Sequence, residues 1–405
     1  MRVERVTLPD IPEANQYPAI RAEEIRSRYS KIVQRMSELE LAVIIIYGDR
    51  EHFANLSYVT GGYDARFEEA LLIIRKNEVP VLITGNEGYS YCEISLLEHK
   101  RELFQTFSLQ GQTRDRKIYL HRILADNGID ARSKIGIIGN KYYEEGETEV
   151  PEKTFDVPHY IIQEVTRLAP IENISNVTSI MTHPENGIRT SITEDEIARF
   201  EYMSSYVSDE MRRLLGGLRI GISETQLLAT MRYRGFPFSA HPVVGFGAER
   251  VMLGLASPIP DSYLKRGDAV NLAIGVEGAN IARTGCAVAS DSEFTGERKN
   301  IVDDFYFPYF RALKSWYEKL RVGEQSRTIY SSVMDVIGAP KFGVGLNPGH
   351  QIHLEEWINS PFRHDRNYAL TTGMALQCDL IAFPGQPYVG VHVEDTLVLA
   401  DRDLQ

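Results

Sequence analysis

The chain has 405 residues, of which 43% are apolar and 25% are charged. This is the composition of a globular protein with room for two or three domains, so a peptide hormone or a disulfide knot is excluded. Forty-four basic against 56 acidic residues give a formal net charge of -12. A chain this acidic has no basic surface for nucleic acid or anionic lipid, and neither is expected as a partner.

The first residues, MRVERVTLPDIPEAN, are charged and polar and lack the apolar core of a signal peptide. Because no apolar run approaches the roughly 18 residues that span a bilayer, we expect a cytoplasmic protein. The three cysteines, Cys92, Cys286 and Cys378, are odd in number and widely spaced. They fit neither a disulfide framework nor a structural zinc cluster, so we predict reduced thiols that pack in the core.

The first half of the chain has the pattern of an α/β module. Apolar residues recur at helical spacing over 20–39, and residues 41–47 (LAVIIIY) form a run that is apolar throughout, which is typical of a strand covered on both faces. Residues 70–75 and 79–84 flank a turn and predict a hairpin, and residues 135–139 predict a further strand.

A domain boundary is predicted at 182–192, which is rich in turn-forming residues. Thr193 followed by Glu196 is a capping-box pattern that starts a new helix. We therefore expect a first domain of residues 1–185 and a second domain of residues 186–405.

The second domain is predicted to be α+β with a mostly antiparallel sheet, because helical and strand patterns follow each other in two successive halves. The predicted segments are helices at 194–215, 224–234, 299–320 and 325–337 and strands at 242–246, 269–274, 375–383 and 389–399.

Polar residues in this domain interrupt otherwise apolar strands and tight turns. Since strands alternate faces, Gln377 and Asp379 share one face, and His392 and Glu394 share one face. If the two strands are neighbours, these side chains converge in a candidate site. The alternative is that His392 and Glu394 lie on the solvated face of an edge strand. Four segments carry such residues: 265–275, 348–357, 373–380 and 390–396.

The order of these segments resembles the creatinase, prolidase and aminopeptidase P superfamily (the M24-type enzymes), whose catalytic domain has the pita-bread fold. In that superfamily two Asp, one His and two Glu bind a pair of metal ions, and a creatinase-type amino-terminal domain precedes the catalytic one. The matching motifs here are Gly267-Asp268, Gly349-His350, Gly373-Met374 and Glu394-Asp395-Thr396, behind a first domain with Tyr47–Arg50 and Leu56–Gly61.

The likeness is incomplete at the metal ligands. The first Asp falls on Ala273, and the second falls on Thr284 in an ungapped count or on Asn280 when the following Arg-Thr pair is aligned. Without these carboxylates one cation loses most of its oxygen ligands, so the standard dinuclear site is not expected.

His350, Asp379 and Glu394 match the remaining ligands, with Asp379 one methylene shorter than the usual Glu. They are the predicted catalytic residues of a metal-free site; alternatively, they hold a single divalent ion. Creatinase, a metal-free relative, implies a catalytic histidine, but its position falls on Ala256.

Other side chains have predicted roles in binding substrate. Neutral imidazole at His350 or His241 is expected to serve as general base near pH 7. Arg283 is expected to clamp a substrate carboxylate, with a surface ion pair as its alternative. Helix-capping or solvent-exposed roles account for Glu355 and Glu356. The predicted substrate-binding residues are His241, Arg283, His353 and His392.

Three functions follow as hypotheses. The first is a hydrolase of the creatinase and prolidase type that cleaves a C–N bond in a small amide-like or guanidino compound or short peptide, without the standard metal pair. The second is a catalytically inactive protein that binds a peptide or small ligand. The third is an aminopeptidase with one metal ion. The resemblance also implies a homodimer.

Overall fold

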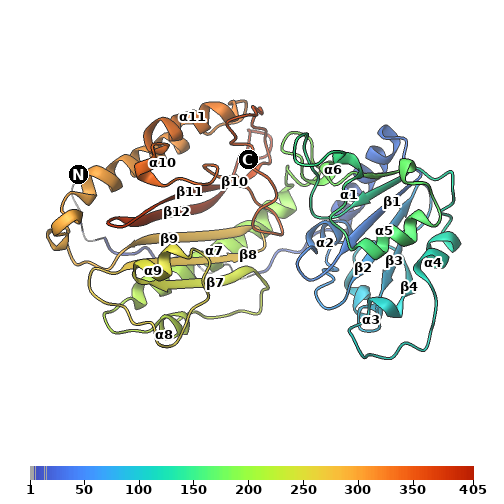
Figure 1. Cartoon of the computed structure of the whole chain (residues 1–405), viewed down its shortest axis with the longest axis horizontal. Helices are drawn as coiled ribbons and strands as arrows, with labels where there is room; N and C mark the ends of the chain where they lie inside the picture. The colour runs from blue at the N-terminus through green and yellow to red at the C-terminus, as the bar shows by residue number, and fades with distance from the viewer. Residues whose placement is uncertain (1–3, 5, 13, 15) are drawn as a thin grey trace. The chain divides into compact units, whose positions relative to one another are not determined.

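The computed structural model describes residues 4, 6–12, 14 and 16–405. The chain divides into two compact units (Figure 1). One is Ile20–Ile188, and the other is Arg189–Gln405 together with the described residues of Met1–Ala19. None of the helices in the described part of the chain combines the length and the apolarity that a membrane span requires.

The first unit is built on a six-stranded mixed sheet in the order β4-β3-β2-β1-β5-β6. The predicted hairpin is confirmed, since β2 and β3 pair antiparallel, while β5 runs parallel to β1. The strands are β1 Val43–Gly48, β2 Ala70–Arg75, β3 Val81–Thr84, β4 Lys100–Leu103, β5 Ile135–Ile138 and β6 Ile174–Asn176, and the helices are α1 Ala22–Glu38, α2 Ala54–Thr60, α3 Gly88–Tyr91, α4 Leu120–Asp126, α5 His159–Thr166 and α6 Ser179–Thr182.

The burial of strand β1 shows that this sheet is covered on both faces. All its residues are buried, as the apolar run predicts. Val43 and Ile45 pack with Leu124 of α4 and Val165 of α5, whereas Ile44 points to the opposite face because side chains alternate along a strand.

The second unit contains a six-stranded sheet in the order β10-β11-β12-β9-β8-β7, and every pair in it is antiparallel. Its strands are β7 Phe238–Phe246, β8 Ala269–Val276, β9 Ala279–Cys286, β10 His350–Gln351, β11 Ala375–Gly385 and β12 Val389–Val398, and its helices are α7 Glu194–Gly217, α8 Glu224–Leu228, α9 Gly247–Met252, α10 Phe307–Lys319 and α11 Ser326–Ile337.

One face of this sheet is covered by long helices. A row of paired residues, Leu272, Arg283, Val393 and Leu380, runs across four strands on that face. Leu272 packs with residues of α7, and Leu380 packs with residues of α10 and α11. Figure 1 shows α7 along β8 and β9, and α10 and α11 along β11 and β12.

The opposite face carries the polar residues. The neighbouring row of partners is Ala273, Ala282, Glu394 and Asp379, in strands β8, β9, β12 and β11. Each residue of this row is adjacent in sequence to a residue of the helix-covered row. Because side chains alternate along a strand, the side chains of this row point away from α7, α10 and α11. The register therefore gathers the candidate site on the face that these helices leave free.

Most predicted elements of the second unit are present, with differences in their bounds. Strand β7 begins at Phe238 rather than at residue 242, and the helix predicted at 299–320 is a π-helix at Val302–Tyr306 followed by α10. Helix α7 runs through Gly217 rather than ending at Leu215, and α8 ends at Leu228 instead of continuing to residue 234. Strand β9 was not predicted from periodicity. It follows a tight turn at Gly278, where φ is +67° and a Cβ atom would lie 2.0 Å from the ring of Phe200.

Candidate functional site

The site is a buried cluster of His350, Asp379 and Glu394, delivered by the neighbouring strands β10, β11 and β12. Asp379 and Glu394 are direct cross-strand partners, and His350 is the partner of Gln377, two residues before Asp379. One ligand atom from each of the three lies within 4.8 Å of the others. The structure thus brings the three predicted catalytic residues together.

The His350 ring is held from several sides. Its Nδ1 donates to the carbonyl oxygen of Gln351 at 3.2 Å. Its Nε2 faces Glu356 at 3.2 Å and also faces both carboxylates of the cluster, Glu394 at 3.6 Å and Asp379 at 3.7 Å. The indole of Trp357 stacks on the imidazole, with ring centroids 4.1 Å apart and planes at 19°.

These carboxylates change the protonation state of His350. Burial disfavours the charged ring, but the hydrogen bonds and charges of Glu356 and Glu394, with the charge of Asp379, outweigh it and raise the pKa of His350 to about 10. At neutral pH the ring is an imidazolium. A ring that favours its protonated form at neutral pH suits proton donation better than the general-base role expected from an unperturbed histidine.

A second imidazole pairs with the cluster. His392 Nε2 lies 2.7 Å from Asp379 Oδ1. Burial opposes the charge on this ring, yet the hydrogen bond and charge of Asp379 prevail and raise the pKa of His392. Burial also raises the pKa of Glu394. His392 and Glu394 are 9% and 3% exposed, so the alternative of a solvated edge face is excluded.

The positions that the resemblance assigns to the two Asp ligands also lie on this face. Ala273 and Ala282 are cross-strand partners in the row of Glu394. Asn280 Nδ2 donates to Glu394 Oε1 at 2.9 Å, whereas Thr284 Oγ1 donates to Asn271 at 2.7 Å. Of the two candidates for the second Asp position, Asn280 is the one that contacts the cluster.

This donor set decides which metal sites fit. Two cations about 3.5 to 4 Å apart need bridging carboxylates on both sides. The side chain of Ala273 has no donor atom, and the amide nitrogen of Asn280 is directed at a carboxylate oxygen. A dinuclear centre does not fit these residues. A single ion does, since His350, Asp379 and Glu394 form the one metal-ligand group found in the described part of the chain.

Three of the predicted substrate-binding residues lie elsewhere. His241 is exposed, and its Nε2 lies 2.8 Å from the carbonyl oxygen of Leu255. Arg283 lies on the helix-covered face and pairs with Asp395 at 2.6 Å, so its surface ion-pair alternative describes it better than a substrate clamp. His353 is buried 3.0 Å from Glu196, and burial lowers its pKa.

The turn after His350 contributes residues that the sequence did not place in the site. Glu356 faces His350, and Trp357 covers it, so a helix-capping or solvent role for Glu356 is wrong. Glu355 instead receives a two-pronged hydrogen bond from Arg189. The usable signal was the run Glu355-Glu356-Trp357, which begins five residues after His350.

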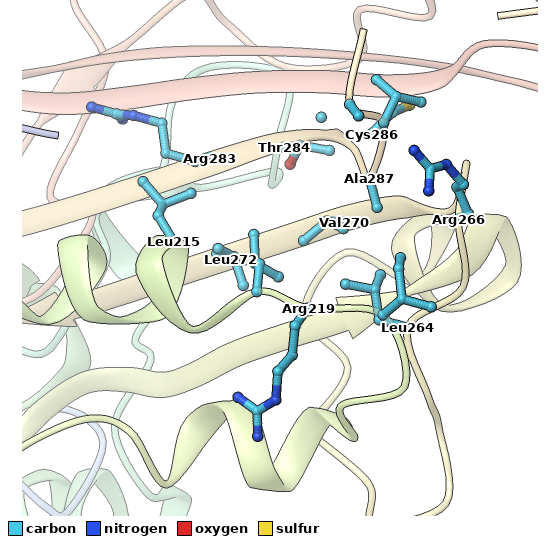
Figure 2. A pocket seen from close by; sticks show the side chains of 15 residues that line it. Leu215, Arg219, Leu264, Arg266, Val270, Leu272, Arg283, Thr284, Cys286 and Ala287 are labelled. Atoms are coloured by element: carbon cyan, nitrogen blue, oxygen red, sulfur yellow. The ribbon is translucent and has the colours of Figure 1, made fainter. Parts of the chain in front are cut away.

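A separate cavity of about 520 Å³ lies on the helix-covered face. Figure 2 shows apolar side chains lining it, among them Leu215 of α7 and Val270 and Leu272 of β8. Val270 and Leu272 alternate with the polar-face residues Asn271 and Ala273, so this cavity and the His350 cluster belong to opposite faces of the sheet. Cys92, Cys286 and Cys378 are free thiols, as predicted.

Comparisons with known proteins identify solved structures that have a similar fold. No protein-family model matches the sequence, and no curated protein shows significant similarity to it. Solved structures do match over most of the chain. The prolidase from Pyrococcus horikoshii OT3 has a TM-score of 0.68 at 18% identity, over 94% of this chain and 100% of that one.

Two further structures agree with the first. An Xaa-Pro dipeptidase from Bacillus anthracis has a TM-score of 0.68 at 16% identity, over 93% of this chain and 95% of that one. An X-Pro aminopeptidase from Thermotoga maritima MSB8 has a TM-score of 0.67 at 17% identity, over 92% of this chain and 95% of that one. The α+β class and the expected likeness are thereby confirmed: this chain has the pita-bread fold of prolidases and aminopeptidases P.

Proposed function

We propose that the protein is a hydrolase that breaks a C–N bond in a small amide-like or guanidino compound or a short peptide, without a dinuclear metal site. The observation that supports this most is the buried meeting of His350, Asp379 and Glu394 at the place where the fold's metal ligands are incomplete. Buried carboxylates are stable only when a cation or proton neutralises them, and here imidazolium groups take that role.

The proposed reaction uses one base and one acid. Glu394, whose pKa is raised by burial, accepts a proton from water as the water oxygen attacks the substrate carbon. The imidazolium of His350 gives its proton to the leaving nitrogen as the C–N bond breaks. Glu394 then returns a proton to His350, whose Nε2 is 3.6 Å from Glu394 Oε1. The sum is water plus a C–N bond giving a C–OH group and an amine.

The polar groups of the site favour a substrate rich in N–H donors. Gln377 is fully buried beside His350, and its Oε1 has no hydrogen-bond partner among the described residues. Together with the oxygens of Asp379 and Glu356 it forms a set of acceptors. Amide and guanidino N–H groups match acceptors of this kind.

The experiment is a substrate panel. Purified protein treated with chelator is incubated with Xaa-Pro dipeptides, guanidino acids and small amides, and product amine is followed by mass spectrometry. We expect turnover of at least one class without added metal. Binding without product over hours would contradict the hydrolase and favour the catalytically inactive protein.

The ligand group also supports a second candidate, a metallo-aminopeptidase with one metal ion held by His350, Asp379 and Glu394. A divalent ion there would supply an activated water molecule. Its activity would be abolished by the chelator used in the panel. A homodimer and a small-molecule or short-peptide ligand remain predictions from the resemblance.

Metal binding at this site is expected to depend steeply on pH. Because the pKa of His350 is about 10, an ion must displace a proton from the ring at any lower pH. The affinity for Mn²⁺, measured by calorimetry, should therefore rise by about tenfold per pH unit from about pH 6.5 to about pH 8.5. His350→Gln, which removes the imidazole ligand, should bind Mn²⁺ much more weakly than the unmodified protein. A pH-independent affinity in the unmodified protein would contradict the proton competition.

A further inference from the structure

The segment after His350 is a closed turn that carries two of the site's side chains. Gln351 N donates to Asn359 O at 2.7 Å, and Ile358 N donates to Gln351 O at 3.1 Å. Glu356 and Trp357 lie within this turn and are the residues that face and cover the His350 ring. Whatever fixes the turn therefore fixes the surroundings of His350.

The first part of the turn is attached to the body of the second unit. Gly278 N, in the turn between β8 and β9, donates to His353 O at 2.7 Å. The His353 ring lies 3.0 Å from Glu196, a residue of the capping box at the start of α7. These contacts hold residue 353, three positions before Glu356.

The part of the turn next to Glu356 is held by Arg189. Its guanidinium donates Nη1 to Glu355 Oε1 at 2.8 Å and Nη2 to Glu355 Oε2, a fork that matches both carboxylate oxygens. The Arg189 side chain is fully buried, and that of Glu355 is 20% exposed. A desolvated bidentate pair of this kind is rigid, because both partners lose alternative geometries.

We propose that Arg189 is a positioning residue for the site: by fixing Glu355 it sets the adjacent Glu356 and Trp357 against His350. Glu355 and Glu356 are consecutive, so the backbone that orients one orients the other. Arg189 acts through Glu355 and is assigned no contact with a substrate. The importance of this role for catalysis rests on the proposed function, but the placement of Trp357 can be measured without any substrate.

The test uses the two tryptophans of the chain. Trp316 is fully buried and Trp357 is 37% exposed, so acrylamide quenching of fluorescence reports mainly on Trp357. Trp357→Phe supplies the Trp316 background. We expect Arg189→Lys and Glu355→Gln to raise the quenching constant by about twofold or more, because the turn loosens when the fork is lost. Lysine keeps the charge but cannot form the fork, so it should not rescue the wild-type value.

The control is Arg266→Lys, which alters another forked pair of the second unit, that of Arg266 Nε and Nη2 with the two carboxylate oxygens of Glu293. It should leave the quenching of Trp357 unchanged. Thermal unfolding verifies that each variant is folded; if Arg189→Lys does not fold, Glu355→Gln decides alone. Unchanged quenching in folded variants would overturn the proposal.

Activity provides the second readout. With a substrate from the panel, folded Arg189→Lys and Glu355→Gln should lower kcat by about tenfold, because misplacement of catalytic groups costs rate. If the unmodified protein hydrolyses nothing, the proposed function fails, yet the quenching result still decides whether Arg189 positions the turn. Wild-type kcat in both folded variants would overturn the catalytic part of the role.

Discussion

His350→Ala is expected to reduce turnover by about a thousandfold. The substitution removes the proposed proton donor to the leaving nitrogen and the ring that Asp379, Glu394 and Glu356 all face. The remaining buried carboxylates then repel one another, so they take up protons and Glu394 is less able to accept one from water. The measurement is kcat on the substrate identified in the panel.

Two comparisons make this result specific. His364→Ala changes an exposed histidine on the segment that follows β10, and it should retain full activity. His350→Gln keeps much of the side-chain volume and tests whether loss of activity comes from loss of the fold, which thermal unfolding reports. Turnover unchanged in a folded His350→Ala protein would refute the assignment of the site.

Ala273→Asp combined with Asn280→Asp is expected to create a second cation site. The two positions lie beside Glu394, Ala273 in its cross-strand row and Asn280 in hydrogen-bond contact with it. The substitutions replace a donor-free side chain and an N–H donor with carboxylate oxygens, the ligand type that a metal pair shares. Bound Mn²⁺ per chain, measured by mass spectrometry of the purified metal-loaded protein, should increase by one equivalent.

The matched control distinguishes the two alignments of the second Asp position. Ala273→Asp with Thr284→Asp adds the same charge on the same face, but Thr284 lies in the row of His392 and bonds to Asn271. This pair should not gain the second equivalent. Equal gain in both double variants would contradict the choice of Asn280, and no gain in either would contradict the argument that missing carboxylates are what prevents a dinuclear site.

Much of the fold was predictable because its signals are local. The capping pattern at Thr193 and Glu196 starts α7 as expected, and the apolar run that becomes β1 is buried on both faces. Strand β9 was missed since its sequence, ANIARTGC, mixes polar and apolar residues. Its central place in the sheet comes from pairing with β8 and β12, a long-range property that local periodicity does not contain.

The site was predictable only in part for a related reason. The alternation of side chains along strands predicted correctly that Asp379, Glu394 and His392 share one face, because residues two apart in a strand point to the same side. The same alternation places Arg283 and Ala282 on opposite faces of β9. The position of Arg283 was not predicted, because β9 was not recognised as a strand. Glu356 and the raised pKa of His350 depend on how a turn folds back, which no spacing rule encodes.

Asn280, whose amide contacts Glu394, and Ala273, in the cross-strand row of Glu394, are both residues that one base change can turn into a carboxylate. Every asparagine codon becomes an aspartate codon by a single base change, and every alanine codon becomes one for aspartate or glutamate in the same way. Two single base changes therefore separate the present side chains from a cluster with two additional carboxylates.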